Sequence, residues 1–355
     1  SGCSADSDLD QLDEGATAAD PDASDGGEPD TIDWGAVIAA VDSHEIPDIT
    51  LLVGDASGVL LTHDKGSSTA DDQLRIGSAT KWLTAATIMS LVERGVMAQA
   101  DRPQDYINNW TTNPSDGRSG MTIDALLSFT SGFAGNPGQV ECTTDPSSDL
   151  TRCVAAIYAS QFAYPPGTTY HYGPSHMHTA ARMAERATGS SWPDIVIAEL
   201  AAPLGIEDQI SWAMASPEHP MPSGGLRTSA NAYARFLTAL AAGELLASRL
   251  ADMAEPRTVG LAIGNTPIDS DIGPWQYGLG QWRECSSPTW DAACESRVIS
   301  SSPGAFGFYP WFDHDSGYWA ILAAELPLVP SNPPTDRVIP LGVDLQPLIR
   351  DALGR

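Results

Sequence analysis

The sequence is short of positive charge, and above all of lysine. Its 18 basic residues face 46 acidic ones, so the formal net charge is −28, and Lys65 and Lys81 are its only lysines. Nucleic-acid binding needs a cationic surface for the phosphates, so we expect no nucleic-acid partner. The chain also lacks an apolar run as long as a membrane span, so we expect no segment that crosses a bilayer.

The acidic residues are concentrated at the N-terminus. Residues 1–31 contain ten Asp or Glu, no Lys or Arg, and almost no large apolar side chain. Such a segment cannot bury enough surface to fold, which predicts a disordered acidic tether. Near its start, Ser-Gly-Cys resembles the end of a bacterial lipobox and predicts a lipid on Cys3 and a place in the cell envelope. The alternative is a secreted, extracellular protein with an unpaired thiol.

The other four cysteines form two pairs that are close in sequence. Cys142 lies near Cys153, and Cys285 lies near Cys294, with no histidine nearby at the spacing of a metal site. Two short disulfide loops in an exported protein are the prediction, and free buried thiols are the alternative. Three histidines, His171, His176 and His178, lie around Tyr172 in the sequence. No second cluster of possible ligands is apparent, so neither a metal nor a cofactor is predicted.

The order of the expected elements favours one α+β domain over residues 32–355. Two β-rich runs lie within 49–65, around the hairpin signal Gly-Asp-Ala-Ser-Gly. A mainly helical part covers about 96–225, and strand-like runs return from about 275. Parts 32–95 and about 226–355 should therefore form one antiparallel sheet, flanked by N- and C-terminal helices, with the helical part as an insertion.

Ser78-Ala79-Thr80-Lys81 is the only Ser-x-x-Lys in the chain. Positions i and i+3 share one face of a helix, so Ser78 Oγ and Lys81 Nζ can meet there. A buried lysine, unlike arginine, can lose its proton, and a neutral amine can then activate a serine hydroxyl as a nucleophile. A helix cap beside a solvated lysine is the ordinary alternative for so short a motif.

Five segments, in order, resemble the serine β-lactamase-like hydrolases, the family of class C β-lactamases, D-Ala-D-Ala carboxypeptidases and related esterases. They are RIGSATKWLTAATIMSLVERG (75–95), LLSFTSGF (126–133), PPGTTYHYGPSH (165–176), MPSGGLRTSANAYARFLTAL (221–240) and SSPGAFGFYPWFDHDSGYWAILA (301–323). The resemblance covers roughly residues 32–353. It implies a β-lactamase/transpeptidase-like fold.

The resemblance also implies roles for individual residues. Ser78 would be the nucleophile, Lys81 its base, and Tyr172 the phenol that passes a proton between serine and leaving group, if nearby positive charge lowers its pKa. The backbone N–H groups of Ser78 and Ala305 are the implied oxyanion donors.

The chain departs from the family pattern in its second and third motifs. Pro174 stands where many relatives have Asn, and Ser302-Pro303-Gly304 stands where the third motif often has Lys or His. The second change removes a cation that helps to hold a substrate carboxylate, although Gly304 still allows close approach. Four aromatic residues near the motifs are candidates for an acyl pocket, or else for the core: Trp82, Phe129, Tyr309 and Trp311.

The sequence therefore predicts a serine hydrolase that forms an acyl-enzyme. A carboxylesterase is the first choice, and a D-amino-acid peptidase, amidase or β-lactamase is the second. A catalytically inactive binding module with the same fold is the alternative of another class. We expect a monomer that acts on a small-molecule or peptide acyl substrate.

Overall fold

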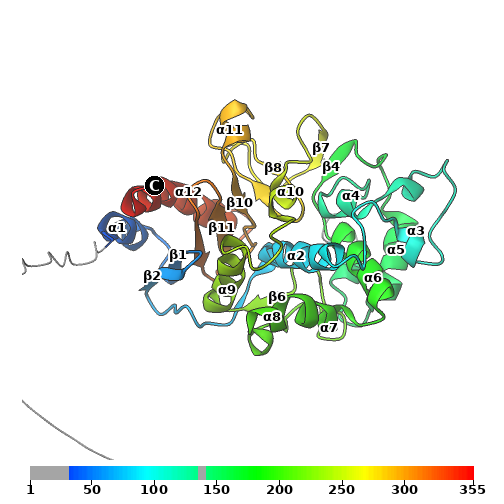
Figure 1. The fold of residues 1–355 in the computed structure, drawn as a ribbon, viewed down its shortest axis with the longest axis horizontal. Helices are drawn as coiled ribbons and strands as arrows, with labels where there is room; N and C mark the ends of the chain where they lie inside the picture. The colour runs from blue at the N-terminus through cyan, green and yellow to red at the C-terminus, as the bar shows by residue number, and fades with distance from the viewer. Residues whose placement is uncertain (1–31, 135–140) are drawn as a thin grey trace, which may run out of the picture. The chain divides into compact units, whose positions relative to one another are not determined.

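A seven-stranded antiparallel sheet joins the two ends of the chain in the computed structural model, which describes residues 32–134 and 141–355 (Figure 1). The strands are β2 (Gly58–Lys65), β1 (Ile49–Asp55), β12 (Tyr318–Ala323), β11 (Tyr309–Asp313), β10 (Ile299–Ser301), β9 (Trp282–Arg283) and β8 (Gln276–Tyr277), in that spatial order. The α+β prediction of one sheet built from both chain ends is confirmed. The predicted tether and Cys3 lie outside the described residues, so both stay predictions.

The β1–β2 hairpin forms where the sequence predicted it. Asp55 pairs with Gly58 across a two-residue turn, and the Asp55 carboxylate accepts the backbone N–H of Ser57 at 2.9 Å. Asp at such a position stabilises a turn by bonding its own backbone two residues on. Gly54 is required here because a Cβ would lie 2.2 Å from the Trp319 ring.

Helices cover the sheet from two directions. Helix α12 (Pro334–Leu353) contacts β11 and also α1 (Gly35–Ser43), whereas α9 (Ala230–Ala241) contacts β1 and β12. Every residue of β11 and β12 is buried, as expected for strands covered on both faces. The run GVDLQPLIRDALG (342–354) on its own predicts the last helix, but this helix begins earlier, at Pro334, and contains Pro340.

The middle of the chain supplies most of the other helices. These are α2 (Thr80–Glu93), α3 (Pro103–Tyr106), α4 (Ile123–Leu127), α5 (Leu150–Ser160), α6 (Ser175–Thr188), α7 (Trp192–Val196) and α8 (Ala202–Leu204), with α10 (Leu250–Ala254) and α11 (Ala292–Ser296) following α9. Small sheets add β3 (Leu74–Arg75), β6 (Leu226–Thr228) and β5 (Ser211–Trp212), and the parallel pair β4 (Thr169–His171) and β7 (Ala262–Asn265). No described helix has the length and apolar character needed to cross a membrane.

Helix α2 is the central element of this arrangement. Of its 14 residues, 12 are buried, and it packs against α6 and α7 while Trp82 meets Phe236 of α9 edge-on. Gly280, in the turn between β8 and β9, lies so close that a Cβ would be 2.8 Å from the Lys81 carbonyl. The N-terminus of α2 is therefore held firmly between strands and helices.

Both predicted cysteine pairs are disulfides. Cys142 is bonded to Cys153, and Cys285 to Cys294. Disulfides are typical of oxidising compartments, so they fit an exported protein. Lipid attachment and an envelope location stay predictions.

Candidate active site

Ser78 and Lys81 meet as their spacing predicted. Ser78 lies in the 3₁₀ turn Gly77–Ala79 that leads directly into α2, rather than in the α-helix itself. Lys81 Nζ is 3.0 Å from Ser78 Oγ and donates to the Ser223 carbonyl at 2.5 Å. The hydroxyl and the amine are thus within reach for proton transfer.

Lys81 is buried without a counter-ion. Its side chain is 4% exposed, and no described carboxylate forms an ion pair with it. Burial lowers the pKa of Lys81 to about 7, because a desolvated ammonium is disfavoured. A substantial share of the side chain is therefore neutral near pH 7 and able to accept a proton.

Tyr172 lies over the same amine, within an aromatic cage. Lys81 Nζ is 4.6 Å from the Tyr172 ring centroid, Trp282 stacks on that ring at 5.8 Å, and Phe129 meets it edge-on at 5.1 Å. Burial raises the pKa of Tyr172 well above its usual value, and a hydrogen bond with Ser78 only partly opposes the shift. The expected lowering by positive charge is not met, so Tyr172 is a phenol that can donate a proton at neutral pH.

Phe129 belongs to the LLSFTSGF segment and contacts Tyr172. It has a positive φ of 58°, which is uncommon for a bulky residue, and it is fully buried. Its ring stacks on Tyr277 at 4.8 Å in addition to its contact with Tyr172. Phe129 therefore holds the Tyr172 ring in place through aromatic contacts, and its side chain offers no hydrogen bond.

The third-motif segment packs directly against the nucleophile turn. Ser302 Oγ donates to the Ser78 carbonyl at 3.0 Å, and a Cβ on Gly304 would lie 2.0 Å from the Ile76 carbonyl. A Cβ on Gly77 would lie 2.9 Å from the Ala305 nitrogen. Within the described chain, the Ala305 N–H has no hydrogen-bond partner. This N–H beside the Ser78 turn is an arrangement able to hold an oxyanion.

The other sequence candidates lie in different surroundings. Pro174 precedes α6 and offers only its carbonyl, which accepts the backbone N–H of His178. Trp82 is fully buried against α9. Tyr309 packs on Gly342 of α12, and Trp311 packs on Tyr309, which is the environment of core residues.

Two parts of the site were missed in the sequence. The Ser223 carbonyl belongs to the Pro-Ser-Gly-Gly-Leu segment, which forms a turn and then β6. Trp282 ends the run Tyr-Gly-Leu-Gly-Gln-Trp, and its aromatic character alone gave no sign that it would stack on Tyr172.

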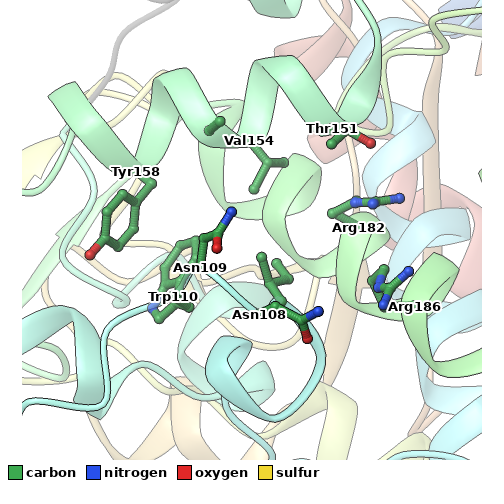
Figure 2. Close-up of a pocket in the computed structure, with 10 residues that line it drawn as sticks. Asn108, Asn109, Trp110, Thr151, Val154, Tyr158, Arg182 and Arg186 are labelled. Atoms are coloured by element: carbon green, nitrogen blue, oxygen red, sulfur yellow. The ribbon is translucent and has the colours of Figure 1, made fainter.

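A separate cavity of about 400 Å³ lies between α5, α6 and the segment 107–110 that follows α3 (Figure 2). Its lining includes Asn108, Asn109, Trp110, Tyr158, Arg182 and Arg186. None of these is a predicted site residue, so the cavity is distinct from the Ser78 site.

Comparison with known proteins identifies a family, sequence relatives and solved structures that are similar to this chain. The family described as Beta-lactamase matches residues 35–329. Penicillin-binding protein 4 of Amycolatopsis lactamdurans is 31% identical over 176 residues, or 47% of this chain and 45% of that protein. Lovastatin esterase of Penicillium rubens is 26% identical over 200 residues, or 48% of this chain and 50% of that protein. The chain therefore spans about half the length of the curated relatives it matches.

Among solved structures, EstCE1, described as a hydrolase with promiscuous acyltransferase activity, superposes with a TM-score of 0.69. The two sequences are 15% identical, and the match covers 89% of this chain and 95% of that one. At that identity the likeness concerns the fold.

Proposed function

Because this chain belongs to the beta-lactamase family, we propose that it is a serine hydrolase that forms an acyl-enzyme on Ser78 and acts chiefly on carboxylic esters. One observation carries the proposal: a buried lysine, with no carboxylate partner among residues 32–134 and 141–355, lies 3.0 Å from a serine hydroxyl. A lysine of this kind is a suitable general base, because its pKa of about 7 matches the working pH.

Acylation begins with attack of Ser78 Oγ on the ester carbonyl. As the new C–O bond forms, the hydroxyl proton passes to neutral Lys81, and the carbonyl π electrons move to the oxygen. The N–H groups of Ser78 and Ala305 are placed to stabilise that oxyanion. Preorganised donors of this type each contribute a factor of about 10² to 10³ to the rate.

Tyr172 serves the leaving group. When the tetrahedral intermediate collapses, the bond to the alcohol oxygen breaks, and that oxygen needs a proton. The neutral Tyr172 phenol, hydrogen-bonded to Ser78, supplies it and is reprotonated from the Lys81 ammonium. Water then attacks the acyl-enzyme along the reverse proton route, which releases the acid and restores Ser78.

The altered third motif supports an ester over a carboxylate-bearing β-lactam or peptide. Ser302 brings no charge, and its hydroxyl is already committed to the Ser78 carbonyl. The nearby Arg75 is paired with Glu325 and stacks on Phe306, so it is not a free replacement for the missing cation. Lovastatin esterase is a relative consistent with this choice, whereas penicillin-binding protein 4 is consistent with the alternative of a β-lactam-binding site.

A fluorophosphonate probe tests the nucleophile directly. We expect one covalent label on Ser78, located by intact and peptide mass, and none in Ser78→Ala. Short p-nitrophenyl esters should be hydrolysed by the wild type and not by Ser78→Ala. Tyr172→Phe should keep the label but lose about 10²-fold or more in turnover, as expected when a general acid is removed.

The other outcomes distinguish the alternatives. A stable penicillin adduct or nitrocefin hydrolysis that exceeds ester turnover would favour the peptidase or β-lactamase assignment. A folded wild-type protein that takes no label and turns over no ester would favour the inactive binding module.

A further inference from the structure

Three buried side chains from distant parts of the sequence converge beside α5 and α6. Cys153 lies on α5, His178 on α6, and His219 in the segment between β5 and β6. Their Sγ and ring nitrogen atoms all lie within 4.8 Å of one another, and all three residues are fully buried. Figure 1 shows the two helices side by side, as their contacts require.

In each of the two histidines, Nδ1 forms a hydrogen bond and Nε2 does not. His178 Nδ1 lies 3.0 Å from the Pro174 carbonyl, and His219 Nδ1 lies 2.9 Å from the Asp145 carbonyl. A carbonyl can only accept, so each Nδ1 carries the hydrogen, and in the neutral form of each ring the free lone pair is on Nε2. Neither Nε2 has a partner among the described residues, although both are buried.

This arrangement matches how proteins prepare a histidine for a metal. A metal-bound imidazole usually donates its other N–H to a backbone carbonyl or carboxylate, which fixes the tautomer and aims the lone pair. Two such rings beside a sulfur atom form a typical zinc donor set. In the structure the sulfur is engaged, because Cys153 is bonded to Cys142.

We propose that the reduced chain binds one Zn²⁺ through the thiolates of Cys142 and Cys153 and the Nε2 atoms of His178 and His219. Disulfide and zinc are then alternative states of the same four residues. A dithiol reductant opens the S–S bond by thiol–disulfide exchange, supplying two electrons and two protons and becoming a disulfide itself. Zn²⁺ then displaces the two thiol protons.

Three of the four donor atoms, those of Cys153, His178 and His219, need only small shifts to reach the metal. Around tetrahedral zinc, with bonds of about 2.0 to 2.3 Å, neighbouring ligand atoms lie about 3.3 to 3.8 Å apart. The present separations of up to 4.8 Å among these three atoms are close to that range, and the fourth donor, Cys142 Sγ, is bonded to Cys153 Sγ. The two sulfurs start as bonded neighbours and separate when the bond is reduced. The sequence did not predict these ligands, because the two cysteines are far from His178 and His219 in the chain and approach them only in the folded structure.

Cobalt binding by the whole 355-residue chain tests the proposal. The protein is reduced with a phosphine under anaerobic conditions and titrated with Co²⁺ and then with Zn²⁺, beside an untreated, oxidised sample. We expect one Co²⁺ per reduced chain, with a thiolate-to-cobalt charge-transfer band and tetrahedral visible bands that Zn²⁺ abolishes. The oxidised sample should show neither.

Variants identify the ligands. His219→Ala should weaken metal binding at least 10-fold, and Cys142→Ser/Cys153→Ser should lose the charge-transfer band. The matched control is Cys285→Ser/Cys294→Ser, which removes the disulfide that is not part of the cluster and should leave binding unchanged. Circular dichroism of each variant, with and without metal, reports its folding.

The proposal is overturned if the reduced chain, folded or not, binds no Co²⁺. It is equally overturned if the variants at residues 142, 153 and 219 bind Co²⁺ as tightly and with the same spectrum as the wild type. Because no reading depends on ester turnover, the outcome is independent of the proposed function.

Discussion

Two regions of the molecule each bury an ionisable group, and the contrast between them separates chemistry from architecture. Between the sheet and α12, Glu284 accepts hydrogen bonds from the Tyr309 hydroxyl at 2.5 Å and from Gln346 Nε2 at 2.7 Å. At the start of α2, the polar and aromatic partners of Lys81 in the described part of the chain are a serine hydroxyl, a backbone carbonyl and the face of Tyr172.

Burial shifts the pKa of both groups toward the neutral form. It raises the pKa of Glu284 and lowers that of Lys81 to about 7. The carboxyl group has a donor for each oxygen, so its surroundings hold it in place as part of the core. The lysine has a reactive partner instead of a counter-ion, and perturbed groups of this kind are typical of functional sites.

The largest expected effect comes from replacing the lysine that lacks a counter-ion. Lys81→Arg should lower kcat/KM for a p-nitrophenyl ester by about 10² to 10⁴, because arginine stays protonated and cannot act as a general base. Steady-state kinetics on the purified variant measure the loss, and circular dichroism checks folding.

The chain supplies its own control in its other lysine. Lys65 donates to the carbonyls of Val41 and His44 and has no contact with a serine hydroxyl among the described residues. Lys65→Arg should keep kcat/KM within about two-fold of wild type. Equal losses in the two variants would mean that the contrast between a structural and a reactive cation is wrong.

The second effect is a pH dependence set by the same amine. Below its pKa of about 7, Lys81 is protonated and cannot accept the serine proton, so kcat/KM should fall about tenfold for each pH unit below 7 and level off above it. Burial raises the pKa of Tyr172, so no second loss is expected near neutral pH. The buried His176 does not supply this titration, because its pKa is lowered to about 3.

The profile is measured from pH 5 to 8.5, after subtraction of spontaneous ester hydrolysis. Circular dichroism over the same range excludes unfolding as the cause. A flat profile would show that Lys81 does not titrate in the free enzyme, and would leave it with a purely electrostatic role.

Local patterns in the sequence were enough to find the reactive pair and the frame that holds it. The Ser-x-x-Lys spacing fixes the approach of Ser78 to Lys81, because it depends on one helical turn, and the β1–β2 hairpin depends on five adjacent residues. The start of α12 was placed too late because Pro340, which usually interrupts a helix, lies inside this one.

Long-range packing accounts for what the sequence did not reveal. Trp282 stacks on Tyr172 only because the fold places β9 beside the helical part of the chain. In the same way, the fold brings together Cys153, His178 and His219, which lie in three separate segments of the sequence. The sequence also left open whether the pKa of Tyr172 is lowered, because the depth of burial around a phenol depends on the whole aromatic cage.

The smallest expected effect on catalysis comes from a change beside Glu284, the buried carboxyl group of the comparison. Tyr309→Phe removes the donor to one Glu284 oxygen, which should lower the free energy of unfolding by about 1 to 3 kcal/mol, the usual cost of a buried polar atom left without a partner. The lost hydrogen bond favours the ionised carboxyl, so the destabilisation should be larger at pH 7.5 than at pH 5. Urea unfolding at the two pH values measures it, while kcat/KM should stay within about two-fold of wild type. If turnover fell while stability stayed unchanged, Tyr309 would belong to the acyl pocket, and the division between the reactive lysine and the structural carboxyl would need to be redrawn.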